Sequence, residues 1–284
     1  MWDRDELYSA YLESNFVLKL YEVYDQPKVH IYEEFRGGSL SDLIFKTFNY
    51  RKLSIQETCT IIYKITEALN YLHERNIVFR NLKPENIVFT REDDFSSLKL
   101  CNFEYAINLN SDIQFQPEIE DSYYSDNQDR LETIQRRMRN SEQDRKRPAG
   151  TVIFMAPEML QEQRYDQGVD IWSLGIIFYL LLTNVHPLQY LTDFVKKTEI
   201  KDAVLEILQG SNPDNLIEFD SAFFDEINSE IEFLLKKMLK IDRKERISAA
   251  QILELQSILS SYYDEYWSQK SKYFFQNNII SIKI

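Results

Sequence analysis

Eight residues in the first third of the chain constrain its fold more than any other feature does. They read Phe79-Arg80-Asn81-Leu82-Lys83-Pro84-Glu85-Asn86. Apolar and β-branched residues at 77–79 and 87–90 flank this octapeptide, and such runs are typical of short strands. The sequence therefore predicts a polar loop held between two short strands.

The octapeptide resembles the catalytic loop of the eukaryotic serine/threonine protein kinases, whose usual form is His-Arg-Asp-Leu-Lys-Pro-Glu-Asn. The resemblance implies that Lys83 contacts the transferred phosphate and that Asn86 holds a metal ion. In the family the aspartate accepts the proton of the attacking hydroxyl, but this chain has Asn81, whose neutral amide is a poor proton acceptor. Phe79 replaces the histidine and is expected to pack as an apolar side chain, and Arg80 is expected to be structural.

A second motif follows a predicted strand at residues 98–100. Where the family has Asp-Phe-Gly, this chain has Asn102-Phe103-Glu104. Phe103 can still pack in a core. Asn102 offers a neutral oxygen where a hard dication prefers a carboxylate, so we expect the metal site to be degenerate. Glu104 replaces a residue whose backbone freedom the family uses.

Three later segments, at residues 150–158, 170–175 and 242–248, resemble the structural motifs of the helical lobe in the same order. By this resemblance Glu158 and Arg246 are expected to form a buried ion pair. Asp170 is expected to begin the central helix of that lobe. These motifs support the fold and carry little information about activity.

The predicted elements fit an α+β, two-lobed kinase-like fold with a partial β N-lobe and a mainly helical C-lobe. Ser54 and Glu57 form a Ser-x-x-Glu capping box at the start of a long helix. The segment 169–182 is apolar nearly all round, so that helix is expected to be central. Strands are predicted at residues 17–24, 29–35, 77–79, 87–90 and 98–100. Helices are predicted at residues 54–75, 169–182, 194–208 and 231–239, with two more beginning near Ser39 and Ser248.

We divide the chain into residues 1–35 as the partial N-lobe, residues 36–260 as the C-lobe and residues 261–284 as an aromatic tail. Within the C-lobe, residues 108–148 are polar and lack apolar periodicity. Such a composition buries too little surface to offset the entropy of ordering, so a mobile insertion in the activation segment is expected. The tail is aromatic enough that we expect it to dock rather than hang free.

Composition narrows the partners and the compartment. The chain has 33 basic and 46 acidic residues, a formal charge of −13, which argues against binding to nucleic acid or to an anionic membrane. Cys59 and Cys101 lie in apolar stretches and are expected to be reduced thiols. The longest apolar run is short for a membrane span. An intracellular, cytoplasmic protein is expected.

Other elements of the family's nucleotide site are not found. The six glycines are Gly37, Gly38, Gly150, Gly168, Gly175 and Gly210, so the chain contains no Gly-x-Gly-x-x-Gly loop. The strand that supplies the phosphate-binding lysine is not found either, which implies an N-terminally truncated domain. Asp5 or Glu6 falls near the helix glutamate of the family and is expected to be solvated. His30 and His73 are expected to be strand or surface histidines.

Catalysis of phosphoryl transfer depends mainly on positioning the reactants and neutralising charge, and these replacements weaken both contributions. The resemblance therefore indicates a degenerate, pseudokinase-like member near the calcium/calmodulin-dependent kinases. We expect it to bind another protein, for example an active kinase, and to need no cofactor. The alternative is a serine/threonine kinase that uses ATP and magnesium and whose first strands lie outside this reading frame. A gene copy without a selected role is a third reading.

Overall fold

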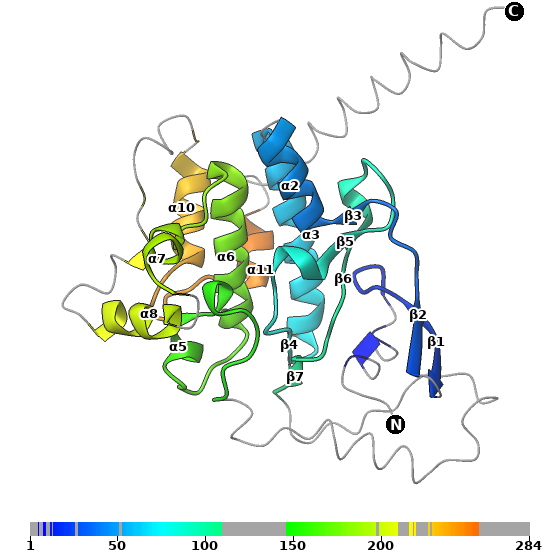
Figure 1. The fold of residues 1–284 in the computed structure, drawn as a ribbon, viewed down its shortest axis with the longest axis horizontal. Coiled ribbons are helices and arrows are strands. Elements are labelled where there is room, and N and C mark those ends of the chain that lie inside the picture. The colour runs from blue at the N-terminus through cyan, green and yellow to red at the C-terminus, as the bar shows by residue number, and fades with distance from the viewer. Residues whose placement is uncertain are drawn as a thin grey trace, which may run out of the picture.

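A two-lobed arrangement places the small strands on one side of the molecule and the long helices on the other (Figure 1). The computed structural model describes residues 5, 8–9, 12, 14–25, 28–50, 53–109, 146–196, 199–209, 216–217, 219, 227 and 229–255. The predicted α+β class is confirmed. The predicted aromatic tail, and residues 110–145 of the predicted insertion, lie outside the described residues.

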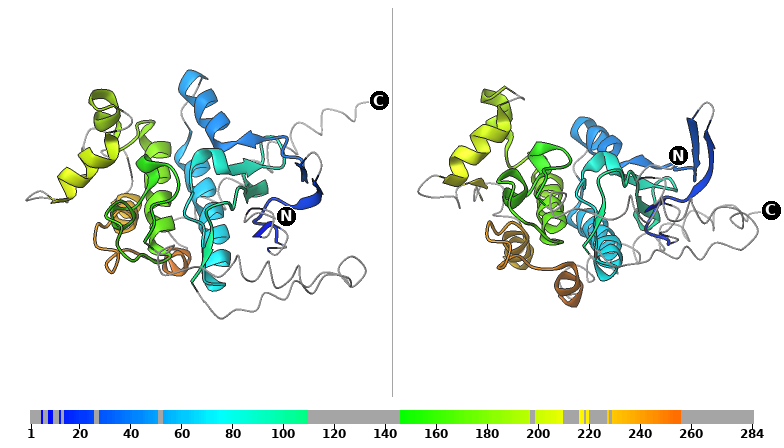
Figure 2. Two further views of the ribbon diagram at one scale, coloured as in Figure 1. Left: turned by 60° about the horizontal axis from the view of Figure 1, so that its bottom comes forward. Right: turned by 90° about the horizontal axis from the view of Figure 1, so that it is seen from below.

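The N-terminal lobe contains an antiparallel hairpin of β1 (Leu20–Asp25) and β2 (Lys28–Tyr32). Side chains alternate along it. Tyr24 and Val29 are paired across the strands and exposed, whereas Val23 and His30, the next pair, are partly buried. Among the described residues this sheet has two strands, and it stands at the edge of the molecule away from the helices (Figures 1 and 2).

Two further small sheets frame the predicted loop. In the first, β5 lies between β3 and β6, and both pairings are antiparallel. In the second, β4 pairs with β7. A parallel bridge between Val17 and Leu100 joins the N-terminal lobe to β6. The strands are β3 (Gly38–Ser39), β4 (Ile77–Val78), β5 (Ile87–Phe89), β6 (Leu98–Leu100) and β7 (Ile107–Asn108).

The helices carry most of the core. The predicted capping box is confirmed, because the Ser54 side chain accepts from the backbone of Glu57 while the Glu57 side chain accepts from the backbone of Ser54. The helices are α2 (Leu40–Tyr50), α3 (Ile55–Glu74), α5 (Pro157–Leu160), α6 (Gly168–Thr183), α7 (Gln189–Phe194), α8 (Ile200–Gln209), α10 (Ser229–Met238) and α11 (Ala249–Glu254). The short 3₁₀ turns are η1 (Pro84–Asn86), η2 (Phe95–Ser97) and η3 (Val152–Phe154).

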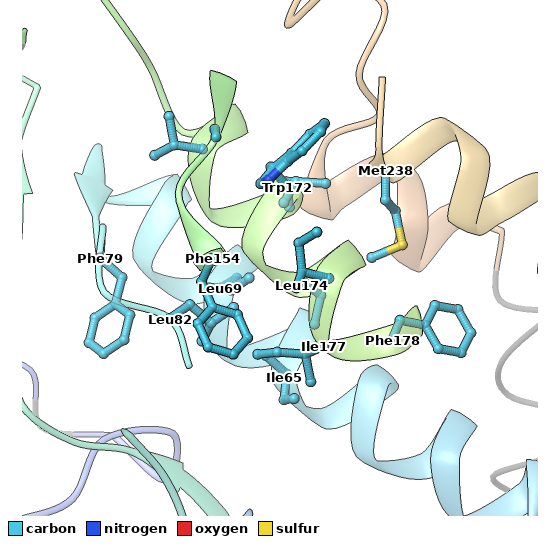
Figure 3. Close-up of a cluster of buried hydrophobic side chains, with 14 of the residues drawn as sticks. Ile65, Leu69, Phe79, Leu82, Phe154, Trp172, Leu174, Ile177, Phe178 and Met238 are labelled. Carbon is cyan, nitrogen blue, oxygen red and sulfur yellow. The ribbon is translucent and has the colours of Figure 1, made fainter. Parts of the chain in front are cut away.

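Helices α3 and α6 form the centre of this core and contact each other (Figures 2 and 3). Figure 3 shows Ile65 and Leu69 of α3 beside Leu174 and Ile177 of α6. All four side chains are fully buried. At Gly175 an added Cβ would lie 2.8 Å from a Leu239 methyl carbon, so a larger residue there would force the Leu239 side chain to shift.

Two expectations about the elements are wrong. The helix predicted at residues 194–208 begins later, at Ile200, because Phe194 is the last residue of α7 and Val195 after it is extended. Asn108, predicted to begin the polar insertion, is buried in β7 opposite Ile77. None of the described helices combines the length and apolar character needed to cross a membrane.

Candidate functional site

The start of the loop at residues 79–86 is held in place by one fully buried carboxylate of α6. Asp170, in the first turn of α6, accepts hydrogen bonds from the backbone amides of Phe79 (2.9 Å) and Arg80 (2.8 Å). His73 Nε2 lies 2.9 Å from the Asp170 Oδ2 atom. His73 is buried, so the expectation of a surface histidine is wrong for this residue. Three donors converge on the carboxylate and set the path of the loop.

Arg80 turns the chain at this point. Its φ of 64° lies in the left-handed region, which is costly for a long side chain. The buried guanidinium is held on two sides, because Nε donates to the Tyr105 carbonyl and Nη1 donates to the Tyr165 hydroxyl, each at 2.5 Å. The Tyr165 hydroxyl in turn donates to the Arg147 carbonyl. Arg80 thus ties the loop to the segment that precedes α6, in agreement with its predicted structural role.

Three asparagines meet at the centre of the site, Asn86 and Asn102 through their side-chain amides and Asn81 through its backbone carbonyl. The Asn86 Nδ2 group donates to the Asn81 carbonyl at 2.8 Å, and the Asn102 Nδ2 group donates to the Asn86 Oδ1 atom at 3.4 Å. Asn81 and Asn86 are buried, with 5% and 4% of their surfaces exposed. Both ends of the Asn86 amide therefore bond to groups of the protein. The predicted residues Asn81, Asn86 and Asn102 are indeed brought together.

The segment after the insertion closes over this group. Gly150 has a φ of 103°, and an added Cβ there would lie 2.8 Å from the Arg80 carbonyl and 3.2 Å from the Asn81 Oδ1 atom. Close contact of this kind requires glycine. The next residue, Thr151, accepts a hydrogen bond from the Lys83 ammonium at 3.2 Å. Lys83 thus lies beside the asparagine group and contacts the covering segment.

An aromatic stack connects the loop to the N-terminal residues. The Phe103 ring meets the Phe79 ring edge to face with centroids 4.9 Å apart, and the Tyr8 ring stacks on it at 6.2 Å. All three rings are fully buried. Phe79 and Phe103 therefore pack as predicted. The backbone amide of Phe103 donates to Asp5 at 2.6 Å, so the expectation that Asp5 is solvated is wrong.

The predicted Glu158–Arg246 ion pair is present and bidentate. Arg246 Nη1 and Nη2 lie 2.7 and 3.0 Å from the two Glu158 oxygens. The guanidinium also donates to the carbonyls of Lys240 and Gly168. Both side chains are buried, and the pair joins α5 to the segment before α11. This geometry satisfies the hydrogen-bonding groups that burial would otherwise leave unmet.

The residues at the expected metal position do not fit a magnesium ion. Magnesium prefers carboxylate and phosphate oxygens, and Asn102 offers a neutral amide where the family has an aspartate. Asn86 is the asparagine that the family itself uses as a metal ligand. The Asn86 oxygen faces the Asn102 NH₂ group, which is a donor. Across the described part of the chain, no group of three or more His, Cys, Asp or Glu side chains could hold a metal ion.

Two described cavities lie elsewhere on the surface. One of about 340 Å³ lies between α2 and the turn that follows β5, and is lined by Arg36, Lys46, Phe89 and Asp94 among others. The other, of about 450 Å³, lies beside β1 and is lined by Lys19, Glu33 and Lys99 among others. Asn81, Lys83, Asn86 and Asn102 line neither of the two.

The fold and the loop define the class of protein: a catalytic-loop scaffold of the protein kinase type, anchored by Asp170 and closed by the Glu158–Arg246 pair. The sequence model described as "Protein kinase domain" matches residues 6–258. The chain therefore belongs to the protein kinase family.

Several curated serine/threonine kinases are similar to the chain. It is 27% identical over 253 residues to "Ribosomal protein S6 kinase 2 alpha" of Gallus gallus, covering 88% of this chain and 28% of that protein. It is 28% identical over 241 residues to "Serine/threonine-protein kinase DCLK3" of Mus musculus, covering 84% and 25%. It is 30% identical over 243 residues to "Putative ribosomal protein S6 kinase alpha-1" of Caenorhabditis elegans, covering 84% and 26%. The matched region is thus between a quarter and three tenths of these relatives' lengths.

Proposed function

We propose that this kinase domain does not transfer phosphate and acts by binding another protein. The observation that carries the proposal is that Asn81 and Asn102 place neutral amides where the family's reaction uses carboxylates, and that the Asn102 Nδ2 group donates to the Asn86 Oδ1 atom. On this proposal the domain needs neither ATP nor magnesium, and it works in the cytoplasm. The free thiols Cys59 and Cys101 are compatible with a reducing compartment.

The rate losses expected from the replacements favour an inactive domain over a slow enzyme. Loss of a general base alone costs about 10²–10⁴ in rate, which a kinase could survive. At Asn102 the change also removes the carboxylate that would bind the metal ion. The metal neutralises the charge of the transferred phosphoryl group, and that electrostatic term is the larger one in this chemistry. Both proton transfer, at Asn81, and charge neutralisation by the metal ion, at Asn102, are therefore weakened in this site.

The β1–β2 hairpin supports a binding role. One face carries Tyr24, Val29 and Ile31, which are exposed by 53%, 44% and 41%. A two-stranded sheet is marginally stable in water, and apolar side chains on its open face favour association with another surface. We propose that this face contacts the partner, for example an active kinase.

An active serine/threonine kinase is the second candidate function. The observation that favours it is Lys83, which is retained beside the loop and hydrogen-bonded to Thr151. The curated relatives named above are kinases by name. If this candidate holds, Lys83 would contact the transferred phosphate, and ATP with magnesium would be required.

Phosphate transfer separates the two candidates. Wild-type protein and a Lys83→Ala variant are incubated with radiolabelled ATP, magnesium and a generic serine/threonine substrate. Equal, background incorporation is expected, because the proposed inactive site makes no use of Lys83. Incorporation that depends on Lys83 would favour the kinase candidate.

A thermal shift titration with ATP, with and without magnesium, accompanies the transfer assay. Wild-type protein is expected to show no magnesium-dependent shift. Asn102→Asp adds a carboxylate and is expected to create one. Asn184→Asp is the matched control, because Asn184 has a similar positive φ at the end of α6 and lies outside the site. A magnesium-dependent shift in wild-type protein would contradict the proposal.

The binding half of the proposal is tested on the hairpin. Ile31→Lys places a charge on the exposed apolar face, and proteins cross-linked to the tagged chain in cells are quantified by mass spectrometry. We expect one or a few partners to fall at least about tenfold, since a buried charge in an interface is costly. Phe194→Lys is the control, because Phe194 is 89% exposed at the end of α7, across the molecule from the hairpin (Figure 1). Equal loss in both variants, or in neither, contradicts the assignment.

A further inference from the structure

The cavity of about 450 Å³ beside β1 is built from four separate segments of the chain. The residues before β1, the start of β1, the residue after β2 and the middle of β6 each contribute to it. A volume of this size lies in the range of small-molecule sites, about 300–1,000 Å³. The lining combines apolar and polar side chains, among them Leu12, Val17, Ser9, Lys19, Glu33 and Lys99.

Backbone hydrogen bonds hold these segments of the cavity wall together. The Leu18 amide donates to the Leu100 carbonyl at 2.9 Å, and the Leu100 amide donates to the Phe16 carbonyl at 2.8 Å. The Glu33 amide donates to the Lys19 carbonyl, also at 2.8 Å. The walls are therefore already in place, and a ligand would bind without the entropic cost of ordering them.

The charged side chains of the cavity are positive in sum, in a chain whose formal charge is −13. Lys19, Lys99 and Glu33 line it. The Lys99 Nζ atom lies 2.6 Å from the Glu33 Oε2 atom, and the same oxygen accepts the Lys19 backbone amide at 3.4 Å. The Lys19 ammonium stands outside this ion pair, 5.7 Å from the centre of the Tyr21 ring. The local excess of positive charge favours an anionic ligand.

Some hydrogen-bond donors of the cavity are not used by the protein. Ser9 is only 5% exposed, and its hydroxyl makes no hydrogen bond to any residue that the structure describes. The Lys99 side chain is 14% exposed, and within the described part of the chain its ammonium reaches one acceptor, Glu33, although it has three donors. Buried donors without acceptors cost free energy. A ligand that brings oxygen acceptors would satisfy both groups.

We propose that this cavity binds a small organic anion, a carboxylate or phosphate compound, whose oxygens accept hydrogen bonds from Ser9, Lys19 and Lys99. The bonds to Glu33 named above all use its Oε2 atom, so the Oε1 atom is placed to accept a hydroxyl of the same ligand. The ligand therefore carries an anionic group near a hydroxyl, as a hydroxy acid or a sugar phosphate does. The asparagines of the loop do not line this cavity, so the inference is independent of whether the domain transfers phosphate.

A nuclear magnetic resonance titration of the full chain, labelled with nitrogen-15, tests the site. The probes are glycerol 3-phosphate, glycerate and inorganic phosphate, with sodium chloride holding the ionic strength constant. We expect saturable shifts of the backbone amides at residues 14–21, 33 and 99 with glycerol 3-phosphate or with glycerate. The two organic probes distinguish a phosphate from a carboxylate ligand. Absence of a saturable shift at these residues with every probe would overturn the proposal.

Inorganic phosphate tests the hydroxyl contact separately. It has the charge of the proposed ligand but lacks the carbon-bound hydroxyl that Glu33 would accept. We expect it to bind more weakly than the better of the two organic probes. Binding as tight as that probe would overturn the role given to Glu33.

Two variants test the donors. Lys19→Gln removes a charged donor from an exposed position without breaking the Lys99–Glu33 pair, and it is expected to weaken binding at least about tenfold. Ser9→Ala removes a neutral donor and is expected to weaken binding about threefold. If Ser9→Ala fails to fold, Lys19→Gln decides the outcome.

Lys46→Gln is the matched control for the lysine variant. Lys46 is an exposed lysine that lines the other described cavity, between α2 and the turn after β5. This variant is expected to bind the probes as the wild-type chain does. Equal affinities in Lys19→Gln and Lys46→Gln would overturn the proposal.

Discussion

Two kinds of buried polar residue surround the loop at residues 79–86, and they differ in charge. Asp170 and Glu158 are ionisable, and each accepts several hydrogen bonds that hold the fold together. Asn81, Asn86 and Asn102 are neutral, and the Asn86 amide bonds to the Asn81 backbone carbonyl and to the Asn102 side chain. Buried charges are tolerated only where partners are supplied. The chain therefore keeps its charges where the protein itself provides the counter-groups, and has amides where a ligand would have to provide them.

The buried Glu158–Arg246 pair is expected to contribute strongly to the stability of the protein. Arg246→Ala leaves a carboxylate that is almost fully buried without its bidentate partner. Removing one partner of such a pair costs about 3–5 kcal/mol in the free energy of unfolding. Urea denaturation followed by circular dichroism measures the loss.

Arg243→Ala provides the comparison. Arg243 pairs with Asp166 at 2.8 Å, but both side chains are partly exposed. An exposed pair is worth about 0–1 kcal/mol, so the urea midpoint of this variant should stay close to that of the wild-type protein. An Arg246→Ala protein as stable as Arg243→Ala would contradict the structural role given to Glu158.

Among the helices and strands, the sequence predicted correctly those positions that are set by neighbouring residues. The capping box placed the start of α3, and the strand predicted at residues 98–100 is β6. The start of α8 was predicted too early, because residues 195–199, which separate it from α7, contain neither proline nor glycine. Phe194 occupies an apolar position of that pattern and yet is almost fully exposed. Periodicity alone does not say whether a side chain is buried.

The residues of the site that could be predicted from the sequence are those that belong to short motifs. Asn81, Asn86 and Asn102 could be placed together because each belongs to such a motif. The contacts of Asp5, and the bond between Tyr165 and Arg80, join residues far apart in the chain. Such pairs leave no local pattern in a single sequence, so sequence reasoning assigned Asp5 to solvent and passed over Tyr165.

The whole molecule consists of a well-packed helical part and a thin strand lobe attached to its edge (Figures 1 and 2). The largest buried side chains of the central helices, including Trp172 and Phe178, come from α6. The hairpin has three large apolar side chains exposed on one face. Global stability therefore resides in the helical part, and the strand lobe depends on contacts such as those of Asp5.

Global stability should fall in mild acid because of His186. Burial lowers its pKa from 6.5 to about 4, and its Nδ1 atom accepts the backbone amide of Leu188. As the pH falls below 6.5, His186 binds a proton in the unfolded chain but not in the folded protein. The free energy of unfolding therefore decreases until the pH reaches about 4. The loss from this residue is up to about 3 kcal/mol.

His186→Asn isolates this contribution. An asparagine oxygen can accept the Leu188 amide and does not titrate. The difference in unfolding free energy between the two proteins, measured in urea at pH 7.5, 6 and 5, is expected to shift toward the variant as the pH falls. A difference that stays constant over this range would show that His186 does not bind its proton more weakly in the folded state.

The anchoring of the loop by Asp170 has a consequence for the order of folding. Asp170 binds amides 90 and 91 residues earlier in the chain, and Glu158 binds a side chain 88 residues later. Closing loops of this size costs entropy before any contact is gained, whereas α3 and α6 can form from local contacts. The left-handed turn at Arg80 is stable only once the long-range bonds exist. The asparagine group is thus expected to be assembled late in folding, after the helices that support it.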